Sequence, residues 1–143
     1  MSKRKAWFRR AHYDENVLVD RYFRKGGVAL RIPISGAGRF KGDVLGFRKH
    51  NIDLIAHRRD DAGKGHVVFK ESEINDLMLQ SRTIAYLLSS PICVNVLLVA
   101  HFPKKRKWVV IHLLHFEGGD VKINDKGEIS LNGEYMNVFW LEA

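Results

Sequence analysis

The chain has 143 residues, 45% of them hydrophobic and 28% charged, which predicts one compact folded domain and excludes an intrinsically disordered chain. No apolar run approaches the roughly 20 residues of a membrane-spanning helix, and a single cysteine excludes an internal disulfide and a cysteine-rich zinc site. The net charge of +8 favours an anionic partner, and we expect a cytoplasmic protein with no membrane partner.

The first half of the chain predicts a basic arm, a helix and three strands. The arm covers residues 1–12, and apolar residues at helical spacing then predict a helix over residues 13–25 that stops at Gly26. Short apolar runs follow, the first of them ending in a Gly/Ser-rich turn. They predict strands over residues 28–34, 44–45 and 52–56.

The second half predicts another helix and further strands. This helix is expected to begin with Ser72 as its N-cap and to end before Pro91. The strands and hairpins are expected at residues 67–69, 94–100, 108–113 and 121–131, with a last apolar segment from Tyr135 to Leu141. The order predicts one α/β domain over residues 1–143, in which a mixed central β-sheet is flanked by helices and residues 114–143 form a small C-terminal β extension.

The positive charge is concentrated in two clusters. The nine cations of these clusters exceed the net charge of the whole chain, so the remaining residues are close to neutral. They are Lys3, Arg4, Lys5, Arg9 and Arg10 in the arm, and Lys104, Lys105, Arg106 and Lys107 between two predicted strands. Such clustering is typical of a surface that binds nucleic acid, and the alternative is a solvated basic face or a solubilising tail.

Two acids have positions that would suit a metal-dependent nuclease. Glu15 falls at the margin of the apolar face of the first helix, and Asp43 begins a short strand after a glycine-rich turn. Carboxylate oxygens bind Mg²⁺ or Mn²⁺, which can activate water against a phosphodiester, although both acids are also compatible with an ordinary surface role. The seven histidines lack metal-binding spacing, and we expect His57 and His101 at strand ends near phosphate or solvent.

From about residue 13 to about residue 113 the sequence resembles a known family. The resemblance rests on Glu15, on the segment Leu30-Arg31-Ile32-Pro33-Ile34-Ser35-Gly36 and on Gly42-Asp43-Val44-Leu45. It is similar to the archaeal-type Holliday junction resolvases, including forms carried by archaeal viruses, within the PD-(D/E)XK nuclease superfamily. The resemblance implies a restriction-endonuclease-like fold and a homodimer that recognises four-way DNA junctions by shape. It also implies a nuclease site in which Glu15 and Asp43 correspond to the acids that bind Mg²⁺ or Mn²⁺ and Ser35 corresponds to an assisting serine.

The family's Glu-x-Lys motif is missing. The best ungapped register places Ala56 at the Glu position and Arg58 at the Lys position. A methyl group cannot coordinate a cation, and arginine stays protonated, so both changes weaken the expected chemistry. Among possible replacement acids, Asp53 should face the opposite side of its strand, whereas Glu73 on the second helix could reach inward.

Three hypotheses follow. The leading one is a homodimer that binds branched DNA and whose nuclease activity is weakened or lost. It would need no obligatory cofactor. It could act alone, or together with an active resolvase or another recombination factor. The second is an active Mg²⁺-dependent resolvase that uses a relocated acid, and the third is a protein-interaction domain that binds through residues 135–141. The residues expected to contact DNA are Lys3, Arg4, Lys5, Arg9, Arg10, Arg31, Arg39, Lys41, Arg58, Lys104 and Lys105.

Overall fold

The computed structural model describes residues 3–33 and 38–142, and it describes side chains from Arg10 onward, except for that of Ala11. In chain order the elements are α1 (Lys3–Arg24), β1 (Val28–Arg31), β2 (Val44–Arg48), β3 (Asn51–Arg59), β4 (His66–Phe69), α2 (Glu71–Leu88), β5 (Cys93–Phe102), the 3₁₀ turn η1 (Pro103–Lys105), β6 (Lys107–Phe116), β7 (Val121–Asn124), β8 (Ile129–Ser130), β9 (Gly133–Asn137) and α3 (Phe139–Glu142). No helix within the described residues is long and apolar enough to cross a membrane.

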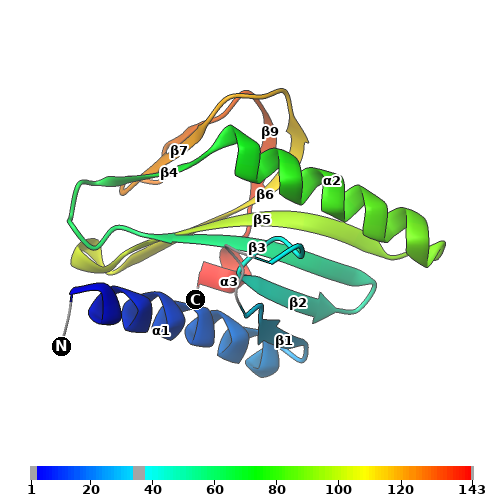
Figure 1. Ribbon diagram of the computed structural model, residues 1–143, viewed down its shortest axis with the longest axis horizontal. Helices are drawn as coiled ribbons and strands as arrows, with labels where there is room; N and C mark the ends of the chain where they lie inside the picture. The colour runs from blue at the N-terminus through cyan, green and yellow to red at the C-terminus, as the bar shows by residue number, and fades with distance from the viewer. Residues whose placement is uncertain (1–2, 34–37, 143) are drawn as a thin grey trace.

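A six-stranded mixed sheet forms the centre of the molecule. Its strand order is β1-β2-β3-β5-β6-β9, with β3 and β5 parallel and every other neighbouring pair antiparallel. Helices α1 and α3 cover one face, and α2 covers the other together with a small sheet of order β4-β7-β8 (Figure 1). The predicted α/β class with a mixed central sheet between helices is therefore confirmed.

Strand alternation divides the core into two apolar clusters. On β3, Leu54 and Ala56 belong to the cluster beneath α2, whereas Ile55 belongs to the cluster beneath α1. Leu18 and Tyr22 enter the second cluster from α1, and both are fully buried. The odd-numbered residues of β3 therefore face α1 and its even-numbered residues face α2.

The first helix is longer than expected. It begins at Lys3, so residues 3–12 continue the helix instead of forming a separate arm. Alanine and arginine favour a helix in this segment, and no glycine or proline interrupts it before Gly26. The basic N-terminal cluster is therefore carried on a helix whose axis runs along the sheet (Figure 1).

The C-terminal residues are integrated into the domain. β9 adds the last strand to the central sheet, and β7 pairs with β4 from the middle of the chain. The hairpin expected over residues 121–131 is confirmed as β7 and β8. The apolar segment from residue 135 onward is divided between β9, whose residues are all exposed, and α3, where Leu141 is buried beneath α1.

The start of the second helix differs from the prediction. α2 begins at Glu71, so Ser72 lies within its first turn, and Lys70 at the N-cap makes no side-chain cap. The carboxylate of Asp120 accepts a hydrogen bond of 2.9 Å from the backbone N–H of Glu71 instead. A residue far along the chain therefore supplies the cap, which local sequence cannot reveal.

Candidate nucleic-acid interface

The site is formed where strand β3 continues beyond the end of its neighbour β2. The ladder between them ends at the pair Val44–Ile55, whereas β3 runs on to Arg59 against β5 alone. Asp43 occupies this open edge, because its N–H donates to the Ile55 carbonyl at 2.7 Å and its carboxylate accepts the His57 backbone N–H at 2.8 Å. A carboxylate is therefore held against the exposed edge of a central strand.

Glu15 on α1 lies near Asp43 and has an unusual pKa. Burial, supported by the negative charges of Asp43 and Asp14, raises the pKa of Glu15 to about 7, and Arg31 opposes this rise. The structure thus brings together two acids that are 28 positions apart in the sequence and places Arg31 beside them. Two carboxylates that share a partly buried site are poised to accept a cation or a proton.

The two positions of the missing motif have other roles in this chain. Ala56 is only 1% exposed and belongs to the apolar cluster beneath α2. The Arg58 guanidinium forms an ion pair with Glu73 of α2, donates to the His57 carbonyl at 2.9 Å and lies over the Phe69 ring. Glu73, the candidate relocated acid, therefore reaches β3, but it does so as the partner of Arg58.

The acidic pair supplies only some of the ligands that a divalent cation needs. Glu15 and Asp43 can supply carboxylate oxygens, and a cation would relieve the repulsion between them. Within residues 3–33 and 38–142, however, no group of three or more His, Cys, Asp or Glu side chains is arranged to hold a metal ion. Ser35, expected near this site, lies outside the described residues. Glu15 and Asp43 are therefore the described residues that would hold such an ion.

Replacing Glu15 with glutamine should stabilise the fold at pH 8. The folded-state pKa of Glu15 lies above its ordinary value of 4.5, so its contribution to stability falls as pH rises from about 4.5 to about 7. We expect Glu15→Gln to raise the free energy of unfolding by about 1 to 3 kcal/mol at pH 8 and to leave it unchanged at pH 4. Urea unfolding at both pH values measures this, and a loss of stability at pH 8 would contradict it.

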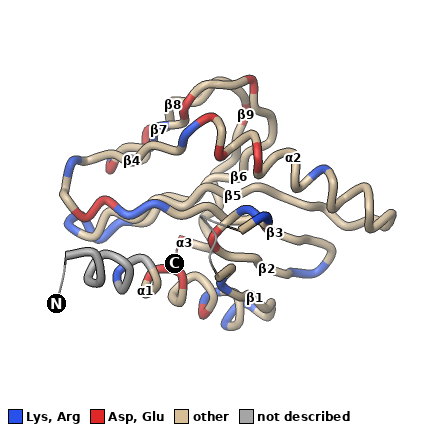
Figure 2. Tube along the Cα trace, viewed as in Figure 1, with Lys and Arg blue, Asp and Glu red and all other residues tan. Residues whose placement is uncertain are grey.

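Cations gather at the end of the molecule where β3 and β5 finish. Lys104 and Lys105 are exposed in η1, and Lys104 reaches across to the carbonyl of Ala62 in the β3–β4 loop. Arg10 on α1 approaches Asp61 of the same loop at 3.9 Å. Figure 2 shows Lys and Arg residues of the β3–β4 loop and the β5–β6 turn at this end of the molecule, to which the start of α1 also points. We call this region the basic end.

The other predicted DNA contacts fall into three groups. Arg31 lies near the acidic pair, and Arg39 and Lys41 lie in the segment that leads into Asp43. Arg58 is held by Glu73, so its charge is already compensated. The side chains of four further residues lie outside those described, although their backbone forms the first turns of α1. These four are Lys3, Arg4, Lys5 and Arg9.

A buried ion network, which the sequence did not suggest, lies directly beside the acidic pair. Asp14 is fully buried, and one carboxylate oxygen contacts both His57 Nε2 and His101 Nδ1 at 2.8 Å. Its other oxygen accepts a hydrogen bond of 2.6 Å from Arg59. The expectation that His57 and His101 contact solvent or phosphate is wrong, because they are 7% and 9% exposed, and His101 stacks on Trp108.

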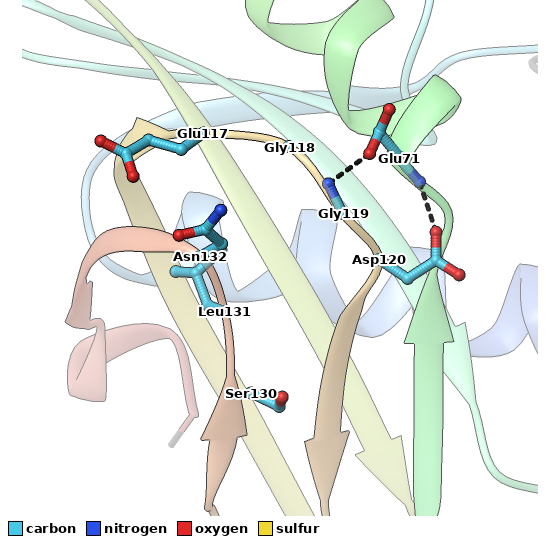
Figure 3. A pocket seen from close by; sticks show the side chains of 8 residues that line it. All are labelled: Glu71, Glu117, Gly118, Gly119, Asp120, Ser130, Leu131 and Asn132. Atoms are coloured by element: carbon cyan, nitrogen blue, oxygen red, sulfur yellow. Dashed lines mark hydrogen bonds between the residues drawn. The ribbon is translucent and has the colours of Figure 1, made fainter.

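An open hollow of about 580 Å³ lies at the N-terminal end of α2 (Figure 3). Asp120 caps the Glu71 backbone, and the Glu71 carboxylate in turn accepts from the Gly119 N–H. The residues that line the hollow are Glu71, Glu117, Gly118, Gly119, Asp120, Ser130, Leu131 and Asn132. Three carboxylates with no cation among the lining residues would repel phosphate, so this hollow is not part of the nucleic-acid interface.

Comparison with known proteins identifies the fold. The chain is similar to the solved structure of Hjc, a Holliday junction resolvase from the archaeal hyperthermophile Archaeoglobus fulgidus, with a TM-score of 0.62 and 17% sequence identity. The match covers 80% of this chain and 87% of that chain. No protein-family model and no curated protein matches the sequence. The similarity shows that this chain shares the mixed α/β fold of that structure.

Proposed function

We propose that this protein binds branched DNA, in particular four-way junctions, and that its nuclease activity is weakened or lost. The observation that carries the proposal is the composition of the site at the edge of β3. Glu15 and Asp43 lie together there. Ala56 stands where a third metal ligand is expected, and Arg58, paired with Glu73, stands where a lysine is expected. The Hjc-like fold supports the choice of substrate. The basic end supplies the cations that a phosphate backbone requires.

A second candidate is an active metal-dependent junction endonuclease that uses Glu73 as its relocated acid. One observation favours it: Oε1 of Glu73 is buried and has no hydrogen-bond partner among the described residues. In this second candidate a cation binds that oxygen. Arg58 opposes this, because its guanidinium already binds the other oxygen of the same carboxylate.

A junction-cleavage assay distinguishes the two candidates. The natural chain is incubated with labelled four-way junctions in Mg²⁺ and then in Mn²⁺, beside Asp43→Asn and Glu73→Gln. We expect no paired nicks with any of the three proteins. Paired nicks that disappear in Asp43→Asn would reject the loss of activity, and a further dependence on Glu73 would establish the second candidate.

We further propose that the DNA-binding unit is a homodimer. The outer side of α2 carries Leu79, Tyr86 and Leu87, which are 65%, 81% and 71% exposed. Leu79 and Tyr86 are seven residues apart, so they lie on one face of the helix. A second copy that covered this face would remove the apolar area from water and present two DNA sites with twofold symmetry. A mass measurement in solution over a range of protein concentrations tests this, and a monomer at every concentration would contradict it.

A further inference from the structure

An exposed aromatic residue, Phe40, lies three residues before Asp43, in the segment that leads into the acidic pair. Phe40 is 39% exposed and belongs to neither apolar core cluster. Arg39 precedes it and Lys41 follows it. Among the exposed aromatic residues that the structure describes, Phe40 alone has a cation on each side in the sequence. The core does not account for a ring in this position.

The backbone on one side of Phe40 is firmly held. Gln80 of α2 accepts a hydrogen bond from the Lys41 N–H at 2.7 Å and donates one to the Lys41 carbonyl at 2.9 Å. Its side-chain amide therefore pairs with both backbone groups of Lys41, as a neighbouring strand would. Gly42 follows with a φ of +110°, a conformation that favours glycine, and packs close to the Ile55 carbonyl and Leu77. The ring of Phe40 is therefore presented from an anchored loop.

We infer that Phe40 stacks on a base exposed at the branch point of a DNA junction, an inference that rests on the proposed function. In a linear duplex every base is covered by its neighbours, and an aromatic ring beside the phosphates has no base face to contact. At a branch point the stack is interrupted, so base faces become accessible. Arg39 and Lys41 would bind the converging phosphates, while Phe40 covers the exposed base. Phe40 then determines specificity for branched over linear DNA.

The test measures the ratio of affinities for a four-way junction and for a linear duplex of the same sequence. Base–aromatic stacking predicts that Phe40→Ala lowers junction affinity about 5- to 100-fold and leaves duplex affinity within about twofold. Phe40→Trp should keep the preference. Phe139→Ala is the matched control, because Phe139 is an exposed aromatic residue at 71% with no neighbouring cation in the sequence. Thermal melts show whether each variant is folded.

A second readout reports the stacking itself. With 2-aminopurine at the crossover, binding of the natural chain and of Phe40→Trp should change the fluorescence, whereas binding of Phe40→Ala at saturation should not. If the natural chain prefers junctions and Phe40→Ala keeps both that preference and the fluorescence change, the stacking role is wrong while the proposed function stands. If the natural chain itself shows no preference for junctions, both are overturned.

Discussion

Replacing both Lys104 and Lys105 with glutamate should lower the affinity for a four-way junction about 50-fold at about 0.1 M salt. The two lysines are exposed at the basic end, and neither forms an ion pair with a described residue. Every lysine that no longer binds a phosphate reduces the slope of log affinity against log salt by about 0.9, so the slope of the double variant should be shallower by about 1.8. Fluorescence anisotropy at several salt concentrations measures both the affinity and the slope.

The matched control makes the same charge change elsewhere. Lys49 lies in the β2–β3 turn and Lys25 directly follows α1. Both are exposed, at the ends of β3 and α1 that are opposite to the basic end. Replacing both with glutamate changes the net charge equally and should alter junction affinity by less than about fivefold, through screened long-range repulsion. Equal reductions of affinity in the two double variants would mean that overall charge, and not the basic end, governs DNA binding.

Replacing Asp14 with asparagine should destabilise the protein by about 3 to 5 kcal/mol. Asp14 is the buried anion between Arg59, His57 and His101. Its removal leaves two buried histidines without their acceptor and leaves Asp61 as the remaining counter-charge of Arg59. Chemical unfolding at pH 7 measures the effect. Asp20→Asn on the same helix is the control, because Asp20 is 67% exposed and its pair with Arg24 should contribute less than about 1 kcal/mol. Similar destabilisation of both variants would contradict the role assigned to the network.

The same network predicts sensitivity to acid. Burial would raise the pKa of Asp14, but the hydrogen bonds and charges of His101 and His57 outweigh it and lower the pKa to about 2. Because the folded-state pKa lies below the ordinary value of 3.8, this contribution is present above about pH 4 and is lost as pH falls to about 2. It amounts to about 2 kcal/mol. Glu15 has the opposite sign, since its pKa is raised.

His57 connects the stabilising network to the candidate site. Its ring contacts Asp14 on the α1 side of the sheet, while its backbone N–H donates to the Asp43 carboxylate at the open edge of β3. Asp14 also directly precedes Glu15 in α1. The network therefore fixes the rotation of α1 against the sheet, and with it the position of Glu15 beside Asp43.

The class of fold, the order of its elements and the pairing of Glu15 with Asp43 could be predicted from sequence. The helix and strand periods are clear, and the resemblance covers the segments that carry both acids. The apolar pattern alone predicted this strand only as far as Ala56, because His57 and Arg59 are polar and such residues are typical of the end of a strand. His57 is buried and Arg59 is partly buried, because β5 extends alongside and Asp14 supplies their counter-charge.

Long-range pairs were the features that sequence reasoning missed. Asp14 and His101 are 87 residues apart, and Gln80 and Lys41 are 39 apart, so no local pattern relates either pair. One signal was nevertheless present. Asp53, His57 and Arg59 share the parity of Ile55 on β3, and three polar residues on one face of a central strand require buried partners. That pattern could have directed attention to Asp14 on the helix opposite.

Junction recognition without cleavage is tested most directly by a competition titration at about 0.1 M salt in Mg²⁺. The natural chain is mixed with a labelled four-way junction and challenged with unlabelled junction or with linear duplex of the same sequence, and the DNA is then examined for nicks. We expect the junction to compete at least about tenfold better than the duplex and to be recovered uncut. Equal competition by the two DNAs would contradict the recognition of branched DNA.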